Sequence, residues 1–381
     1  MDWDLTLSSR AADAVATATG ALSALQSSSI GNDLEALAAP LLRSEALGSS
    51  FIEGLRASNK RLAVATYEPR AADFTALAVL GNVNAMEKAI EIGFQDRLIK
   101  VDDLVDIHRT LLAGTSEAKF AGIVRTDQNW IGGRGLSPAD ATFIPPPEDR
   151  VPALLEDLIN FVNLDDIPAV AQAAIAHGQF ETIHPFGDGN GRSGRCLIHV
   201  VLKRRGLTAH FTPPISVVLA ANAKRYIAGL IDFREGRVDD WIGVFSDAVT
   251  AAVEATKRLQ SDIIKLLDDL VDRAGSPRTD SVARKIILGL SAQPIVSAAS
   301  VALRYEVTPT AARSALNNLE LSGVLVPLRI GRRRNREWIS DELFQVLDTF
   351  EYSIAEPPSR QPRRPSPSPT RPPRRNINQH P

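Results

Sequence analysis

The sequence predicts a mainly α-helical protein with a small β-hairpin in its middle and a winged helix-turn-helix domain near its C-terminus. Three observations support this fold class. Residues 10–95 are rich in Ala, Leu and Glu with few helix breakers. The segment 121–147 is instead interrupted by glycines and prolines, as irregular loops are. Residues 281–339 contain three short helical patterns followed by two β-prone pieces.

The totals indicate a chain of two or three domains. It has 381 residues, of which 44% are hydrophobic and 23% charged, and its formal net charge is -2. No apolar run approaches the roughly 20 residues that a membrane helix needs, and the N-terminus lacks the layout of a signal peptide. The single cysteine, Cys196, cannot form an intramolecular disulfide. We therefore expect a cytoplasmic protein with no membrane partner.

The helical patterns follow one another in a regular order up to residue 267. After the N-terminal helices we expect helices at 101–112, 151–162, 169–182, 196–205, 216–235 and 239–267. Gly206 directly follows one of them, as a C-terminal cap does. The short pieces 129–131 and 142–144 are predicted to pair as the hairpin.

A polar linker at 271–280 precedes the C-terminal elements. There we expect helices at 281–290, 297–305 and 308–322, and strands at 324–328 and 336–339. Thr308 and Pro309 form a helix start, with an N-cap and a proline at the first helical position. The expected organisation is an N-terminal helical region (1–100), a core (101–250), a helix and linker (251–280), the winged helix-turn-helix domain (281–345) and a disordered Pro/Arg-rich tail (346–381).

The richest concentration of chemistry is the run His184-Pro-Phe-Gly-Asp-Gly-Asn-Gly-Arg-Ser-Gly-Arg195. Its glycines let the backbone turn its N–H groups toward a ligand. Arg192 and Arg195 match phosphate oxygens, and Asp188 suits Mg²⁺, which reaches proteins through one or two carboxylates and the phosphates of a ligand. His184 has the residue type that suits proton abstraction near neutrality. The run therefore predicts phosphate-ester chemistry on a nucleotide.

Simpler interpretations of the same residues were weighed. A histidine that follows a helix often caps the last carbonyls, and a glycine-rich turn often has no ligand. A calcium loop would need a glutamate where His199 stands. A zinc site from His177, His184, Asp188 and His199 lacks the i, i+4 histidine pair of helical zinc motifs. The position between two helices favours an anion site, because residues 191–195 would form the N-terminus of the second helix.

The run matches the signature His-Pro-Phe-x-Asp-Gly-Asn-Gly-Arg-x-x-Arg of the Fic family at every defined position, and the chain resembles that family over about residues 40–250. The segments 122–133, 144–147 and 176–183 are similar to the family's flap region and to the helix before the histidine. The fold that this implies is a Fic-type helical core whose hairpin flap pairs with a target segment.

The resemblance implies transfer of AMP from ATP to a Ser, Thr or Tyr hydroxyl of a target protein. His184 would deprotonate the hydroxyl, and Asp188 would hold Mg²⁺ between the α- and β-phosphates. Kinase-like relatives have a lysine where this chain has Gly191. The ATP-binding residues would be Gly189, Asn190, Gly191, Arg192 and Arg195, with Tyr226 as a further candidate.

The resemblance also implies control by the chain itself. Ser49-Ser-Phe-Ile-Glu53-Gly54 fits the family's inhibitory pattern Ser/Thr-x-x-x-Glu-Gly/Asn, in which the glutamate pairs with the second arginine of the motif. That arginine is Arg195, so Glu53 would compete with ATP. The alternative is that Glu53 is an ordinary solvated charge. Removal of AMP, with Glu53 orienting water, is a further possibility.

Other assignments stay open from the sequence. Tyr226 and Trp241 fit an adenosine pocket or the core equally well. The wing carries Arg329, Arg332, Arg333, Arg334 and Arg336. Such a wing meets DNA phosphates or docks a protein, and the rival function is a nucleotide-sensing transcriptional regulator. The expected partners are ATP, a target protein and possible DNA, with a possible homodimer.

Overall fold

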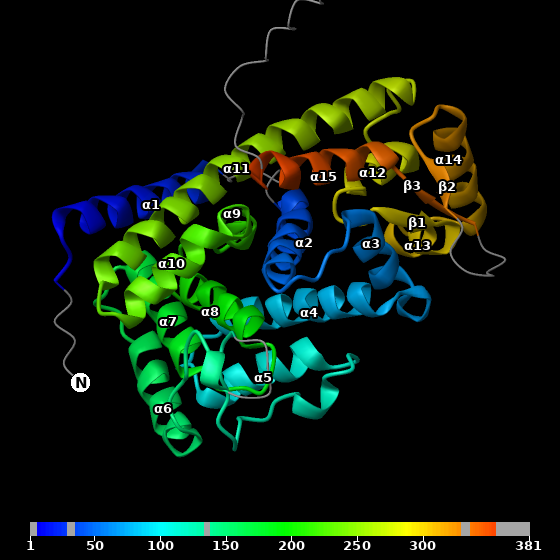
Figure 1. Ribbon diagram of the computed structural model, residues 1–381. Helices are drawn as coiled ribbons and strands as arrows, with labels where there is room; N and C mark the ends of the chain where they lie inside the picture. Colours follow the sequence, from blue (N-terminus) through cyan, green and yellow to red (C-terminus); the bar gives the residue numbers. More distant parts are fainter. Residues whose placement is uncertain (1–5, 29–34, 133–137, 329–335, 356–381) are drawn as a thin grey trace, which may run out of the picture.

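The computed structural model describes residues 6–28, 35–132, 138–328 and 336–355, which form fifteen helices, a three-stranded sheet and four short 3-10 turns (Figure 1). The N-terminal helices are α1 (Ser9–Ser28), α2 (Glu35–Ile52), α3 (Asn59–Tyr67) and α4 (Phe74–Phe94). The central helices are α5 (Val101–Leu112), α6 (Val151–Val162), α7 (Ala169–Ile183), α8 (Asn190–Arg204), α9 (Ile215–Ala221) and α10 (Ala223–Arg234). The C-terminal helices are α11 (Val238–Arg273), α12 (Val282–Gly289), α13 (Ala298–Arg304), α14 (Pro309–Leu321) and α15 (Asp341–Ala355). The strands are β1 (Ile295–Ser297), β2 (Val326–Leu328) and β3 (Glu337–Ile339), and the 3-10 turns are η1 (Pro69–Ala71), η2 (Ala118–Phe120), η3 (Pro138–Asp140) and η4 (Glu148–Arg150).

Helices α7 and α8 lie at the centre of the molecule, with α4 and α5 against α8 and α11 against α7. The first half of α7 is rich in alanine, and small side chains let neighbouring helices approach closely. Trp241 of α11 is fully buried and donates its indole N–H to the carbonyl of Ala174, 2.7 Å away. The loop between α7 and α8 is therefore held by a well-packed helix pair.

Helix α11 connects the two ends of the molecule. Its 36 residues span about 54 Å at 1.5 Å per residue. Helix α1 packs along it at one end and α15 at the other, so the first and last described helices both lie against this one helix (Figure 1).

The C-terminal elements form a compact module of α12, α13 and α14 with a small antiparallel sheet of strand order β1-β3-β2. In the sheet, Ile339 of β3 pairs with Ile295 on one side and Val326 on the other. Thr308 accepts a hydrogen bond from the amide of Ala311, so it caps α14 as expected. The three helices and strands β2 and β3 follow the predicted order, whereas β1 was not predicted, and the winged helix-turn-helix assignment stays a prediction.

Two predicted element boundaries are wrong in the C-terminal half. The single helix expected at 216–235 is divided at Asn222, because α9 packs against α2 while α10 packs against α7. The helix expected to end at 267 continues to Arg273, so the linker is shorter than the predicted 271–280.

The tail predicted to be disordered from residue 346 onward is wrong over its first ten residues, which belong to α15. The buried side chains of Leu343, Phe344, Leu347 and Phe350 give this helix an apolar face. Residues 356–381 of the predicted tail lie outside the described residues.

Helix α15 and the sheet contact the N-terminal helices directly. Glu351 accepts hydrogen bonds from Ser44 of α2 and Asn59 of α3, at 3.1 and 3.0 Å. Lys60 pairs with Asp341 at 2.9 Å, and Ala63 packs in a cluster with Ile339 of β3. The C-terminal module therefore contacts α2, the helix that ends directly before Glu53.

In the described part of the chain, the search for helices with the length and apolar character of a membrane span finds none.

Candidate active site

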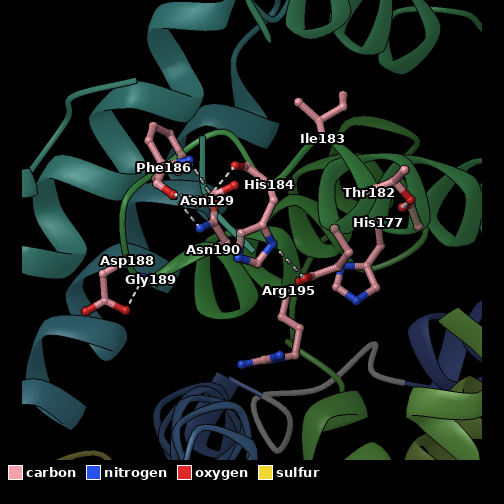
Figure 2. A network of polar contacts seen from close by, with 12 residues as sticks. Asn129, His177, Thr182, Ile183, His184, Phe186, Asp188, Gly189, Asn190 and Arg195 are labelled. Atoms are coloured by element: carbon pink, nitrogen blue, oxygen red, sulfur yellow. Dashed lines mark hydrogen bonds and ion pairs between the residues drawn. The ribbon is translucent and has the colours of Figure 1, made fainter. Parts of the chain in front are cut away.

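His184 follows α7 as its C-terminal cap and has a left-handed backbone conformation, with φ of 49°. This conformation is costly for a residue other than glycine, by about 1–3 kcal/mol. The carbonyl of His184 accepts hydrogen bonds from Arg125 Nε at 2.9 Å and from Asn129 Nδ2 at 3.3 Å. The close view in Figure 2 shows Asn129 beside this turn. Side chains from the segment before the flap thus hold the strained turn that aims the imidazole.

The imidazole of His184 is largely removed from water, with its side chain 19% exposed. This burial lowers the pKa of His184 to about 4. At neutral pH the ring is therefore neutral, and one of its nitrogens is free to accept a proton.

The loop that follows is closed by Asn190. Its side chain accepts from the amide of Phe186 and donates to the carbonyl of the same residue, both at 2.8 Å (Figure 2). Phe186 is fully buried, in agreement with an anchoring role. The amide side chain of Asn190 is thus committed to the loop, and its backbone N–H remains as the group for a ligand.

His108 supports the loop from α5 and was missed in the sequence analysis. Its ring stacks on Phe186 with centroids 3.7 Å apart, and its Nε2 lies 2.9 Å from the carbonyl of Asp188. The amide of Gly122 donates to Nδ1 at 3.0 Å, so Nε2 carries the proton and donates. The sequence places His108 on the apolar face of an amphipathic helix. A histidine at such a position can support a loop or simply pack in the core, and the sequence does not distinguish the two.

Helix α8 begins directly after the loop, with Gly189 as its N-cap at a positive φ of 73° that favours glycine. The free backbone N–H groups of this end attract anions. Arg192 lies in the first turn and is only 6% exposed. Within the described ranges its Nε has no hydrogen-bond partner, and burial lowers its pKa. A buried guanidinium with an unpartnered donor at a helix N-terminus could hold a phosphate.

Arg195 is fully buried one turn further along α8. It donates to Ser49 Oγ at 2.9 Å, to the carbonyl of Ser49 at 2.8 Å and to Glu53 Oε1 at 2.7 Å. Burial raises the pKa of Glu53, but the charge of Arg195 outweighs it and holds that pKa below its usual value. Glu53 is therefore ionised at neutral pH and paired with Arg195.

The carboxylate of Glu53 also lies over the start of α8. A Cβ atom placed on Gly191 would come within 2.1 Å of Glu53 Oε1. The Glu53 carboxylate thus occupies the anion site that the glycine leaves open.

Tyr226, a candidate for the adenosine pocket in the sequence analysis, is largely buried. It is 3% exposed, and its hydroxyl lies 2.8 Å from His177 Nε2 and 3.5 Å from Arg195 Nη1. Trp241 is likewise in the core. Tyr226 therefore contacts Arg195 through its hydroxyl group.

Asp188 is exposed at the rim of the loop, where its Oδ1 accepts from the amide of Gly189 at 2.7 Å. No cluster of three or more His, Cys, Asp or Glu side chains suited to a metal was found in the described segments, which disfavours the zinc site. A single carboxylate beside a phosphate cradle does fit Mg²⁺, because this ion takes most of its other ligands from water and substrate phosphates.

Together the helical fold and this site place His184 beside the N-terminus of α8 and its two buried arginines. The Fic/DOC family model matches residues 98–202, and the Fic/DOC family N-terminal model matches residues 6–91. The chain belongs to the Fic/DOC family.

Two relatives with curated names are protein adenylyltransferases. The protein adenylyltransferase fic-1 of Caenorhabditis elegans is 32% identical over 143 residues, which are 36% of this chain and 25% of that protein. A probable protein adenylyltransferase of Aquifex aeolicus is 30% identical over 207 residues, covering 52% of this chain and 57% of the relative. The matched region thus spans between a quarter and somewhat over half of these proteins.

Two solved structures share the fold. A crystal structure of a Fic family protein from Desulfovibrio desulfuricans G20 has a TM-score of 0.55 at 19% identity, and the match covers 89% of this chain and 98% of that one. A structure of residues 134–508 of Fic-1 from Caenorhabditis elegans has a TM-score of 0.53 at 20% identity, with 64% and 71% of the two chains covered.

Proposed function

We propose that this protein is an adenylyltransferase that transfers AMP from ATP to a hydroxyl side chain of a target protein and releases pyrophosphate. The observation that carries the proposal is the neutral imidazole of His184 beside the anion site formed by Arg192 and the start of α8. A base that faces a phosphate cradle is the pairing that attack of a hydroxyl on a phosphorus atom requires. The family and the names of its relatives support the same activity.

The reaction follows from these groups. His184 takes the proton of the acceptor hydroxyl, the oxygen bonds to the α-phosphorus, and the bond to the β-phosphate bridging oxygen breaks. Pyrophosphate leaves, and His184 returns its proton to solvent. Arg192 and the backbone N–H groups of Asn190 and Gly191 would hold the phosphate oxygens, whereas the amide of Gly189 already donates to Asp188. Asp188 would hold Mg²⁺, and the bound ion would offset negative charge on the phosphates.

The proposal includes inhibition by Glu53. Its carboxylate is bonded to Arg195 and covers the anion site at Gly191, so a γ-phosphate and Glu53 would compete for one guanidinium. The pair is partly desolvated, since Arg195 is 1% and Glu53 38% exposed, and a charge-assisted contact in such a place is stronger than one in open solvent.

ATP labelled at two different positions tests the reaction. Incubation of the Glu53→Gly variant with cell lysate and Mg²⁺ should transfer label from α-labelled ATP to protein and none from γ-labelled ATP. Label from γ-labelled ATP alone would indicate phosphotransfer and overturn the proposal.

A second candidate is removal of AMP from a modified protein. It is favoured by the partly exposed carboxylate of Glu53 inside the site, where it could orient a water molecule. In that case the Glu53→Gly variant would lose the ability to release AMP from a labelled target.

The DNA-binding role of the wing stays a prediction. Arg329, Arg332, Arg333 and Arg334 lie outside the described residues. Arg336 is paired with Glu320 and lies over the ring of Trp338, 5.3 Å from its centroid, so it is held within the module.

A further inference from the structure

Glu181 is a buried carboxyl group in the last turn of α7 that the proposed reaction leaves without a role. Its residue is 6% exposed, and its Oε2 lies 3.9 Å from Nδ1 of His184. Among the described residues, its Oε1 has no hydrogen-bond partner. Burying an unsatisfied carboxyl group is costly, so its presence beside the base calls for a physical explanation.

The adjacent helix makes room for this carboxyl group. A Cβ atom on Gly194 of α8 would lie 2.9 Å from Glu181 Oε1 and 3.1 Å from His177 Nδ1. Any larger residue at this position would push Glu181 away from α8. Gly194 thus lets the carboxyl group of Glu181 lie against α8 while it stays near His184.

We propose that Glu181 is a positioning residue for His184, whose Nδ1 proton its carboxylate accepts so that the Nε2 lone pair faces the acceptor hydroxyl. This proposal rests on the proposed AMP transfer. A carboxylate behind a histidine fixes the tautomer of the ring and stabilises the imidazolium that forms when the base takes a proton. The separation of 3.9 Å is longer than a hydrogen bond, and such contacts tighten when substrate is bound.

The charge state of Glu181 is set by groups from several elements. Burial raises the pKa of Glu181 to about 7, Arg195 of α8 and Arg234 of α10 act to lower it, and Glu53 acts to raise it. Tyr226 of α10 and His177 of α7 complete the surroundings of this carboxyl group. Glu181 is therefore a carboxylate mainly above neutral pH, and removal of the Glu53 charge extends that range downward.

The test measures kcat and KM for ATP from pH 5.5 to 8.5 in the Glu53→Gly background, with and without Glu181→Gln. Glutamine keeps the shape and one acceptor oxygen but removes the charge. We expect kcat at pH 8.5 to fall by about 10- to 100-fold, less than the loss of a general base costs, because His184 itself remains. The KM for ATP should change by less than about threefold, since Glu181 would act on the base and not on the nucleotide. The ratio of the two kcat values should move toward one as the pH falls through the pKa of Glu181 in this background.

Glu351→Gln is the matched control, because burial also raises the pKa of Glu351 to about 7. It lies on α15, away from the base, so its kcat ratio should stay flat with pH. A second measurement uses the nitrogen chemical shifts of the histidine rings in the full-length protein. The ring of His184 should carry its proton on Nδ1 at pH 8, and Glu181→Leu should abolish this preference.

A kcat ratio that is independent of pH, or an Nε2-protonated ring with Glu181 present, would overturn the role of Glu181. A Glu53→Gly parent that transfers no AMP would instead contradict the proposed function itself, and the chemical shifts would still report on the contact between Glu181 and His184.

Discussion

Glu53 and Arg195 form an ion pair with 2.7 Å between Oε1 and Nη2, and the same carboxylate oxygen lies over Gly191 at the start of α8. The two contacts place an internal anion at the one end of α8 that attracts anions. Ser49, one turn before Glu53 on α2, gives Arg195 two further acceptors. Ser49 and Glu53 thus occupy Nε and Nη2 of the guanidinium group before any nucleotide arrives.

Replacement of the base tests the chemistry. His184→Ala in the Glu53→Gly background should lower AMP transfer by at least about 10²-fold, because a general base is lost. ATP should bind with nearly unchanged affinity, since Arg192, Arg195 and the start of α8 remain. Transfer would be followed with α-labelled ATP and binding by calorimetry. Labelling at the parental rate would show that another group removes the proton.

Ser49→Ala weakens the contact between Arg195 and the end of α2 without removing Glu53. The variant loses the hydrogen bond between Ser49 Oγ and Arg195 Nε but keeps the carbonyl contact and Glu53. One such bond contributes about 0.5–1.5 kcal/mol, so transfer should rise by roughly 2- to 10-fold, less than in Glu53→Gly. Initial rates with α-labelled ATP check this order. Equal rates for wild type and Ser49→Ala would mean that Arg195 does not limit ATP access.

The contact between α15 and the N-terminal helices makes stability depend on pH. Burial raises the pKa of Glu351 to about 7, whereas the ordinary value of a glutamate is 4.5. Because the folded state holds this proton more tightly, the resulting stability is fully present below about pH 4.5 and is lost as pH rises through about 7. Glu351→Gln removes this loss. The free energy of unfolding of the variant, relative to that of the wild type, should therefore be higher at pH 8 than at pH 5, by up to about 3 kcal/mol.

Thermal unfolding at pH 5, 6, 7 and 8 measures this difference. Glu342→Gln on the same helix is the control, because Glu342 is an exposed carboxylate paired with Arg273. Its difference from wild type should stay constant over the same range. A Glu351→Gln difference that is also constant would show that the Glu351 carboxyl group does not titrate near pH 7.

The wing is tested by the dependence of DNA affinity on salt. If Arg332, Arg333 and Arg334 neutralise phosphates, their joint replacement by alanine should reduce the log–log slope by up to about three units. The loss should be similar for every sequence. Arg336→Ala is the control, because Arg336 is already paired with Glu320. No DNA binding by the wild type at low salt would leave this module as a protein-docking element.

The helical architecture could be predicted from the sequence because it depends on local signals, and the candidate site residues could be named because they lie in one motif. The helices at 101–112 and 151–162 have the predicted bounds, and the Fic motif brings together His184, Asp188 and the two arginines over twelve positions. The residues that the sequence did not indicate depend on contacts between segments far apart in the chain. Glu181 gains its significance only from the approach of α8, and His108 only from the approach of the loop at 186–190.

The break at Asn222 and the helical start of the predicted tail have the same origin. Both follow from which helix packs against which, and a polar linker at 271–280 gave no sign that α15 returns to α2 and α3.

Inhibition of AMP transfer by Glu53 is tested most directly by the initial rate of protein labelling from α-labelled ATP, compared between the wild type and Glu53→Gly. We expect the labelling rate of Glu53→Gly to be at least about 10-fold higher than that of the wild type, because Arg195 is then free to hold the γ-phosphate. Labelling that is equal in the two proteins, or lower in Glu53→Gly, would contradict this inhibition.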